Sequence, residues 1–457
     1  MSPPTDEICL RRVEMEPVRP MIAAPVTPIN QTDSSSSLSL VEDQCQLIAC
    51  DDMREARMTL NFWKFWSGQA ISRLGTSFTS FALPLLVFRL TGSAFNLALS
   101  SAAYFLPYLL FGLFIGAWVD RSNRKRTMIM SDLARALILL SIPFLAATSR
   151  LTVWWIYLVT FLASALSIFF STAEFAAIPS LVQSRKDLVS ANGRIQASYS
   201  AATIIGPLLA GLLTSFFPLP SLLILDSASF LVSATMVSLI DTSFNVASAE
   251  APPRSLVRTL ADGLRYVWRN PILRSLSLMI GLVNFVSSTV NAQLVFFAKR
   301  QLSATNSEIG LLFSAGSAGV VALSLTAGLL RKRWSFSQVA LGALALIGLL
   351  TVTLSLTHRY RQGLILWALI YGFTSLFNIN AASLRQAITP NELLGRVMSI
   401  AQVLAWSAIP LGSLLGGLAI ERLGDTAPVF AAIGILVTLI AIAFSFSPVG
   451  RANEAGR

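Results

Sequence analysis

The residues best able to do chemistry are polar side chains that recur at helical spacing inside long apolar segments. Gln69, Arg73 and Thr76 follow one another at intervals of four and three residues, which places them on one face of a helix. A polar residue in such a segment is costly unless it faces a cavity or a partner, so this face indicates a lining that can hydrogen-bond a solute. Three later segments carry similar faces, made of Ser164, Ser167, Ser171 and Glu174; of Asn284, Ser287 or Ser288, and Asn291; and of Thr374, Asn378 and Arg385.

These four faces fall on the first, fourth, seventh and tenth of the long apolar segments. That regularity favours one shared, water-accessible path over unrelated hydrogen bonds between neighbouring helices. For any single serine, the hydrogen bond between helices is the better interpretation. The residues predicted to line a substrate cavity are Gln69, Arg73, Thr76, Ser167, Ser171, Glu174, Asn284, Asn291 and Asn378.

Three carboxylates are candidates for exchanging a proton with a bound solute, and Glu174 is the one that belongs to a predicted cavity face. Asp132 and Arg135 are three residues apart, so they can form an ion pair within one helix. A purely structural ion pair is the alternative. Asp226 lies near the outer end of the sixth segment, where it can carry a proton or simply mark a helix end at the lipid headgroups.

The elements that must position these residues are transmembrane helices. Apolar residues make up 54% of the 457 residues and charged residues only 12%, whereas soluble proteins have about 25% charged residues. A helix needs about 20 apolar residues to cross a bilayer. The sequence therefore predicts an all-α integral membrane protein with twelve transmembrane helices, at residues 65–88, 95–118, 127–147, 152–175, 195–216, 221–240, 272–296, 306–330, 335–357, 363–384, 397–420 and 428–447.

The helices divide into two halves of six. We expect a disordered, Ser- and Pro-containing cytoplasmic tail at the N-terminus, although translation starting at Met53 or Met58 is an alternative. The predicted domains are the tail at 1–60, a six-helix bundle at 61–240, a cytoplasmic linker at 241–271, a second six-helix bundle at 272–447 and a short cytoplasmic tail at 448–457.

The net charge of +11 acts as an orientation signal. If the N-terminus is inside, most loop Lys and Arg residues lie on the inner side, as in the runs Arg124-Lys125-Arg126 and Arg331-Lys332-Arg333. We therefore expect a multi-pass protein of the cell membrane with both termini cytoplasmic. The charge needs no nucleic-acid partner to explain it.

Two short motifs connect the halves to a known family. The segment from Gly116 to Arg126 resembles the loop signature of the major facilitator superfamily, with Asn123 in place of the usual glycine; asparagine tolerates a left-handed turn. The segment from Gly206 to Gly211 resembles the fifth-helix signature associated with antiporters, and Gly412 to Gly417 is a weak internal copy of it. Three further strings, Gly68-Gln69…Gly75, Asp132…Arg135 and Arg385…Gly395-Arg396, are similar to the branch containing macrolide-efflux and enterobactin-exporter-type proteins.

The resemblance implies a secondary active transporter that exports an amphiphilic small molecule, such as a drug, macrolide, siderophore or peptide-like metabolite. It also implies alternating access and proton antiport, with the proton gradient as energy source and no cofactor. An uptake symporter or a lysophospholipid flippase on the same fold is the alternative. The implied gating residues, among them Asp120 latching onto the start of the eleventh helix, are Gly116, Asp120, Arg121, Arg124, Lys125, Gly206, Pro207, Gly211, Arg385, Gly395 and Arg396.

Other functional classes lack their motifs in this sequence. The one histidine, His358, is distant from the three cysteines, which all precede residue 51, so no zinc or other metal site is expected. No Gly-Lys dipeptide occurs, which excludes an ATP-binding P-loop, and no hydrolase motif is present. We expect a monomer whose partners are the lipid bilayer and a small-molecule substrate.

Overall fold

The computed structural model describes residues 60–119, 121–182, 185–245 and 264–451, and these residues form helices joined by short loops. The first bundle contains α3 (Leu60–Thr91), α4 (Ala94–Val119), α5 (Arg124–Ala147), α6 (Val153–Ala177), the 3-10 helix η1 (Ile178–Leu181), α7 (Arg185–Leu213) and α8 (Ser221–Ser238). The second bundle contains α10 (Pro271–Ala292), α11 (Leu294–Arg300), α12 (Asn306–Arg333), α13 (Phe336–Ser355), α14 (Tyr360–Ile388), α15 (Asn391–Leu423) and α16 (Ala427–Ser445). Within these described ranges, twelve helices are long and apolar enough to cross a membrane, which agrees with the predicted number.

Capping residues set where several helices begin. Thr305 and Glu308 form a capping box at the start of α12, and each satisfies a main-chain N–H of the other. Asn123 begins α5 by accepting a hydrogen bond from the N–H of Arg126, with φ −74° and ψ 105°. The left-handed turn predicted at Asn123 is therefore wrong. This position needs an acceptor oxygen on an extended residue and makes no use of the conformational freedom of glycine.

The seventh predicted helix also ends differently from the prediction. It was expected to run to residue 296, but α10 stops at Ala292 and the short α11 follows Gln293. The N–H of Gln293 donates to the carbonyl oxygens of Asn291 and Thr289, and this closes α10. The side chain of Gln293 is fully buried at this break.

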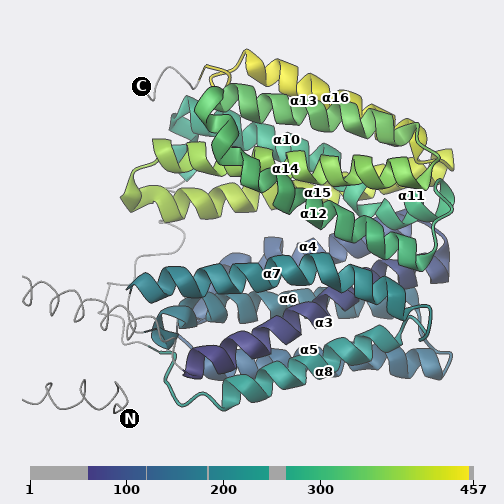
Figure 1. The fold of residues 1–457 in the computed structure, drawn as a ribbon, viewed down its shortest axis with the longest axis vertical. Coiled ribbons are helices and arrows are strands. Elements are labelled where there is room, and N and C mark those ends of the chain that lie inside the picture. Colours follow the sequence, from purple (N-terminus) through teal and green to yellow (C-terminus); the bar gives the residue numbers. More distant parts are fainter. Residues whose placement is uncertain (1–59, 120, 183–184, 246–263, 452–457) are drawn as a thin grey trace, which may run out of the picture. The chain divides into compact units, whose positions relative to one another are not determined.

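Equivalent helices pack in the same way in the two bundles. In the first bundle, α3 contacts α7 and α8, α5 contacts α6 and α8, and α4 contacts α6; in the second, α10 contacts α15 and α16, α13 contacts α14 and α16, and α12 contacts α14. Between the bundles, α4 packs on α15 and α7 packs on α12 (Figure 1). We call the end where α4 joins α5 and α12 joins α13 the basic end, because Arg121, Arg124 and Arg331 to Arg333 lie there, and the other end the distal end.

Glycines permit the close approach of these helices at four matching places. A Cβ atom at Gly206 of α7 would overlap the side chain of Ser77 in α3, and one at Gly412 of α15 would overlap the carbonyl group of Phe285 in α10. Further along, Gly211 packs on α12 of the other bundle, and Gly417 packs on α4. The internal repeat seen in the sequence therefore corresponds to two pairs of equivalent contacts, one pair within the bundles and one pair between them.

The seam between α7 and α12 provides a first prediction. A Cβ atom at Gly310 would lie against the carbonyl oxygen of Pro207 and 3.1 Å from the Cα of Gly211, so Gly310→Ala should force the backbones apart. We expect it to lower the free energy of unfolding by about 1–3 kcal/mol, measured by denaturation in detergent. Gly328→Ala in the same helix is the control, because a Cβ there meets nothing within 4 Å. Equal losses in the two variants would contradict the packing argument.

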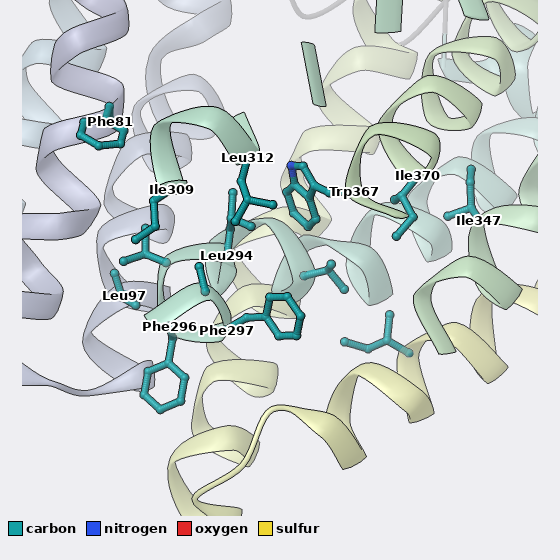
Figure 2. Packing of buried hydrophobic residues seen from close by; sticks show 14 of the residues in the cluster. Phe81, Leu97, Leu294, Phe296, Phe297, Ile309, Leu312, Ile347, Trp367 and Ile370 are labelled. Atoms are coloured by element: carbon teal, nitrogen blue, oxygen red, sulfur yellow. The ribbon is translucent and has the colours of Figure 1, made fainter. Parts of the chain in front are cut away.

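An apolar core joins the two bundles toward the distal end. Figure 2 shows Leu97 of the first bundle beside Phe296 and Ile309 of the second, and all three are buried in one hydrophobic cluster. The ring of Phe88 meets that of Phe296 at 5.9 Å between centroids. Apolar packing of this kind therefore contributes to holding the bundles together at this end.

Candidate substrate cavity

Three adjoining cavities form a path between the bundles. One of about 320 Å³ lies in the first bundle, and one of about 370 Å³ lies mainly against the second. A third, of about 350 Å³, connects them: it shares Ser80 and Tyr104 with the first cavity and Asn291 and Tyr371 with the second. We call the three together the central cavity.

The central cavity is lined by the polar faces that the sequence analysis selected. The first bundle contributes Gln69, Arg73, Thr76, Ser167, Ser171 and Glu174, and the second contributes Asn284, Asn291 and Asn378. Contact of these residues with a substrate stays a prediction. Ser164, which shares this helix face, is not among the residues lining the three cavities: it is buried and donates a 2.6 Å hydrogen bond to the carbonyl oxygen of Tyr104. It is an example of the hydrogen bond between helices.

An ion pair crosses the part of the cavity that lies in the first bundle. Arg73 Nη2 of α3 donates to Glu174 Oε1 of α6 over 2.6 Å, and 20% and 13% of the two side chains remain exposed. The guanidinium of Arg73 also lies 5.7 Å from the ring centroid of Tyr199 in α7. Among the described residues, Glu174 is the only carboxylate in the central cavity lining. A charged solute in the cavity could therefore reach Arg73 or Glu174 and take the place of its present partner.

A second ion pair lies behind the first. Arg135 of α5 pairs with Asp132 one turn earlier, as their spacing predicts, and Asp132 is fully buried. The guanidinium of Arg135 is also in contact with two aromatic rings, with centroids 4.6 Å away for Phe170 and 4.2 Å for Phe230. Only Arg135 of this pair reaches the cavity lining. The pair is enclosed by protein and has the surroundings of a structural ion pair.

Asp226 lies inside the first bundle and away from the cavity. Its carboxylate is fully buried and accepts hydrogen bonds from the hydroxyl groups of Thr79 in α3 and Ser229 in α8. No basic side chain among the described residues hydrogen-bonds it. Asp226 thus faces α3 inside the first bundle, and its interpretation as a helix-end residue at the headgroups stays an alternative.

The wall formed by the second bundle is polar but uncharged. Asn284 Nδ2 donates to the carbonyl oxygen of Ala405 over 2.9 Å, and the hydroxyl of Tyr371 donates to Asn291 Oδ1. Thr374 and Asn378 complete this lining on α14. Arg385, predicted on the same face of α14, is buried instead, and its Nε has no hydrogen-bond partner among the described residues.

The predicted gating residues are only partly described. Asp120 lies outside the described residues, and for Gly116 in α4 and for Gly395 and Arg396 in α15 the structure describes only the helical backbone. Arg121 is exposed. Arg124 Nη1 donates to the carbonyl oxygens of Ala176 and Phe244, and Lys125 Nζ to those of Ser238 and Ile240, so these two cations bind within the first bundle. Pro207 and Gly211 lie at the α7–α12 seam and Gly206 packs on α3, and the role of these three residues in gating stays a prediction.

Hydrogen bonds between the bundles, within the described part of the chain, gather at the distal end. Ser307 Oγ of α12 donates to the carbonyl oxygen of Gly211 over 3.1 Å, and Gln293 Nε2 donates to that of Ala94 over 2.7 Å. These hydrogen bonds close the two bundles together at the distal end.

Lys299 lies at the same end, just outside the membrane-spanning helices. Burial lowers the pKa of its ammonium group, and the nearby carboxylate of Glu308 partly opposes this shift.

Aromatic side chains were missed by the sequence analysis. Tyr104, Tyr108 and Tyr199 line the first cavity, and Tyr371 lines the other two. Trp406 of α15 packs on Tyr108 with 4.9 Å between ring centroids, which brings the bundles into contact beside the cavity. The chain also has twenty-eight Phe and nine Trp residues, so the presence of a ring did not distinguish side chains that face the cavity from those that face lipid. Only knowledge of which helices pack together could have selected the cavity tyrosines.

A comparison with protein families fixes the family of the chain. A model of the family described as transmembrane secretion effectors matches residues 57–456. The chain belongs to the major facilitator superfamily. Its place in the macrolide-efflux branch agrees with the motifs near Gly68, Asp132 and Arg385. Members of the superfamily are transporters and not enzymes, and this member is a multi-pass membrane protein.

Curated relatives of this superfamily member are efflux proteins. Macrolide efflux protein A of Streptococcus pyogenes is 27% identical over 389 residues, which cover 84% of this chain and 95% of that protein. The multidrug efflux pump Tap of Mycolicibacterium fortuitum is 26% identical over 391 residues, which cover 82% and 92%. We therefore assign the chain as an efflux transporter of the superfamily.

Solved structures share the superfamily fold at low sequence identity. The nucleoside transporter NupG matches with a TM-score of 0.68 and 14% identity, over 84% of this chain and 98% of that one. A bacterial homologue of the iron transporter ferroportin matches with a TM-score of 0.63 and 18% identity, over 85% and 100%. At these identities the likeness concerns the fold alone.

Proposed function

We propose that this transporter exports an amphiphilic small molecule across the cell membrane by proton antiport. The observation that carries the proposal is the Arg73–Glu174 ion pair in the lining of a cavity between two bundles. A charged pair at this place can be opened by protonating Glu174, which would release Arg73 and change how the cavity holds its substrate. The proton gradient would supply the energy, and no cofactor takes part.

The orientation is part of the proposal. We place the basic end and both termini in the cytoplasm, since basic loops favour the cytoplasmic side of a membrane. With the distal end closed by contacts such as Ser307 to Gly211, the central cavity would then receive its substrate from the cytoplasm or the inner leaflet. One chain forms the whole cavity, which supports a monomer as the working unit.

The lining supports an amphiphilic substrate. Aromatic rings of Tyr104, Tyr108 and Tyr371 offer apolar surface, while Asn284 and Asn378 offer neutral hydrogen-bonding groups. The relatives named as macrolide and multidrug efflux proteins support drug-like molecules of this character. A siderophore or a peptide-like metabolite has similar chemistry, and a resistance and secretion profile in a host without its own exporters would separate these classes.

Among the proton candidates, the position of Glu174 favours it over the others. Asp132 and Asp226 are fully buried, and neither lines the central cavity. A proton bound at Asp226 would have to pass α3 before it could affect a substrate. We therefore propose Glu174 as the exchanging group, with Arg73 as its alternating partner and the Asp132–Arg135 pair as support.

Collapse of the proton gradient should stop the export. In inverted membrane vesicles with sodium removed and the membrane potential held constant, we expect an uncoupler to reduce accumulation of a macrolide to the level of passive entry. Accumulation that continues under these conditions would contradict proton coupling. Substrate that leaves the inverted vesicles instead of entering them would contradict export and favour an uptake symporter.

A further inference from the structure

The first turn of α4 is capped by an acid from the other bundle. Glu421 Oε2, near the end of α15, accepts a hydrogen bond of 2.8 Å from the N–H of Ala94 and one of 3.4 Å from that of Phe95. The first N–H groups of a helix have no partner within the helix, and the helix dipole favours a negative charge beside them. The side chain of Ser93, just before the helix, accepts a 3.2 Å hydrogen bond from the N–H of Asn96, so Glu421 adds a cap from the second bundle to the local one.

Gln293 binds the same turn from a second helix. Its Nε2 donates 2.7 Å to the carbonyl oxygen of Ala94, and its side chain is fully buried, with Oε1 lacking a hydrogen-bond partner among the described residues. A buried amide oxygen without a partner lowers stability, so packing alone does not account for a glutamine here. Among the described residues, the carbonyl oxygen of Ala94 is the one hydrogen-bond partner of this side chain.

Gly417 allows the contact to form. A Cβ atom at this position would lie 3.2 Å from both the carbonyl oxygen of Ala94 and Nε2 of Gln293, and against the side chain of Ala98. The first turn of α4 is therefore held by three contacts from the second bundle: Gln293 at the break after α10, and both Gly417 and Glu421 of α15.

We propose that Glu421 and Gln293 are positioning residues for transport, which hold the distal end closed by gripping the first turn of α4. Because each contact joins one bundle to the other, opening the cavity at the distal end must break all of them together. The contacts of Glu421 and Gln293 with α4, which we call the grip, then stabilise the closed distal end relative to the open one. The proposal does not depend on substrate or on proton coupling, so it can fail independently of the proposed function.

The chain offers a matched control at the same end. Glu308 also accepts a helix-capping hydrogen bond, from the N–H of Thr305 over 2.8 Å, but both residues belong to the second bundle. Removing Glu308 loses a cap of the same kind without removing a side chain that bonds the other bundle, because the neighbouring contact to Gly211 is made by the hydroxyl of Ser307. A difference between Glu421 and Glu308 variants therefore reports the grip and not the general cost of losing a cap.

The test measures the distal distance between the bundles. Spin labels on Arg150→Cys and His358→Cys, both exposed distal loop residues, are introduced with Cys9, Cys45 and Cys50 replaced by Ser. In nanodiscs without substrate, pulsed electron paramagnetic resonance should find mainly the short, closed distance. We expect Glu421→Ala to raise the ratio of open to closed forms about tenfold, the effect of losing about 1.4 kcal/mol, and Glu308→Ala to leave it unchanged.

Gln293→Leu keeps the proposal falsifiable if Glu421→Ala does not fold. Leucine fills the same space and removes the unpaired Oε1, so thermal stability should hold or rise while the open form becomes about tenfold more populated. A merely structural glutamine would shift stability and leave the distance unchanged. The proposal is overturned if Glu421→Ala and Gln293→Leu give the parent distance distribution, or if Glu308→Ala opens the distal end equally.

Discussion

Glu174→Gln is expected to abolish proton-driven accumulation of substrate while leaving downhill exchange intact. Glutamine has nearly the same shape as glutamate but cannot alternate between a charged and a neutral form. In this variant Arg73, 2.6 Å from the carboxylate in the parent protein, would keep a hydrogen-bond acceptor but lose its charged partner. Without a group that binds and releases a proton in the cavity, the proton gradient has nothing to act on, and we expect accumulation to fall at least tenfold.

The measurement compares two fluxes in proteoliposomes that contain the same variant. Accumulation driven by an imposed proton gradient reports coupling, and exchange of labelled against unlabelled substrate without a gradient reports binding and rocking alone. Thr172→Val is the control, because Thr172 lies on the same helix outside the lining of the central cavity and its hydroxyl donates to the carbonyl oxygen of Ile168 in that helix. Full accumulation by Glu174→Gln would move the coupling role to Asp132 or Asp226.

Periodicity accounts for most of what could be predicted about the cavity. The spacing of Gln69, Arg73 and Thr76 defines one helix face whatever the partner helices are. The cost of placing polar groups against lipid then turns that face inward, and the structure places these residues in the cavity lining. Twelve spans followed from helix length and composition in the same direct way.

Pairing between distant helices could not be read from one sequence. Arg73 and Glu174 are 101 residues apart, and nothing local to either indicates the other. Ser164 has the same spacing to Ser167 as a cavity residue would have, yet it bonds Tyr104 of α4, because helix packing decides which edge of a polar face is covered. The break at Gln293 was hidden for a similar reason, since an apolar run continues into α11.

The two walls of the cavity differ in the kind of polar group that they present. The charged pairs all lie in the first bundle, within the described residues, and the second bundle presents amides and hydroxyl groups. Ionisable groups are therefore concentrated on one side of the path and neutral hydrogen-bonding groups on the other. Substitutions such as Asn378→Ala should accordingly change which substrates are exported more than how export is driven.

Asp132→Asn is expected to cause the largest loss of stability. The substitution leaves the charge of Arg135 buried between Phe170 and Phe230 without its carboxylate. Breaking a buried ion pair by neutralising one partner typically costs about 3–5 kcal/mol, because the remaining charge stays desolvated. We expect the free energy of unfolding in detergent to fall by this amount, and the double variant Asp132→Asn with Arg135→Gln to recover much of it, because no unpaired charge then remains.

Asp226→Asn is the comparison that separates the effect of losing a charged partner from the effect of changing a buried carboxylate. Asp226 is as buried as Asp132, but its partners are the hydroxyl groups of Thr79 and Ser229, one on each carboxylate oxygen. The amide oxygen of an asparagine can accept from one of these hydroxyl groups, and its NH2 group can donate to the oxygen of the other. The expected loss is therefore about 1 kcal/mol, the scale of a single altered hydrogen bond. Equal losses for the two Asn variants, or no recovery in the double variant, would mean that the Asp132–Arg135 pair contributes no more than ordinary buried hydrogen bonds. The first bundle would then owe its stability to packing, and Arg135 would be free to take part in transport.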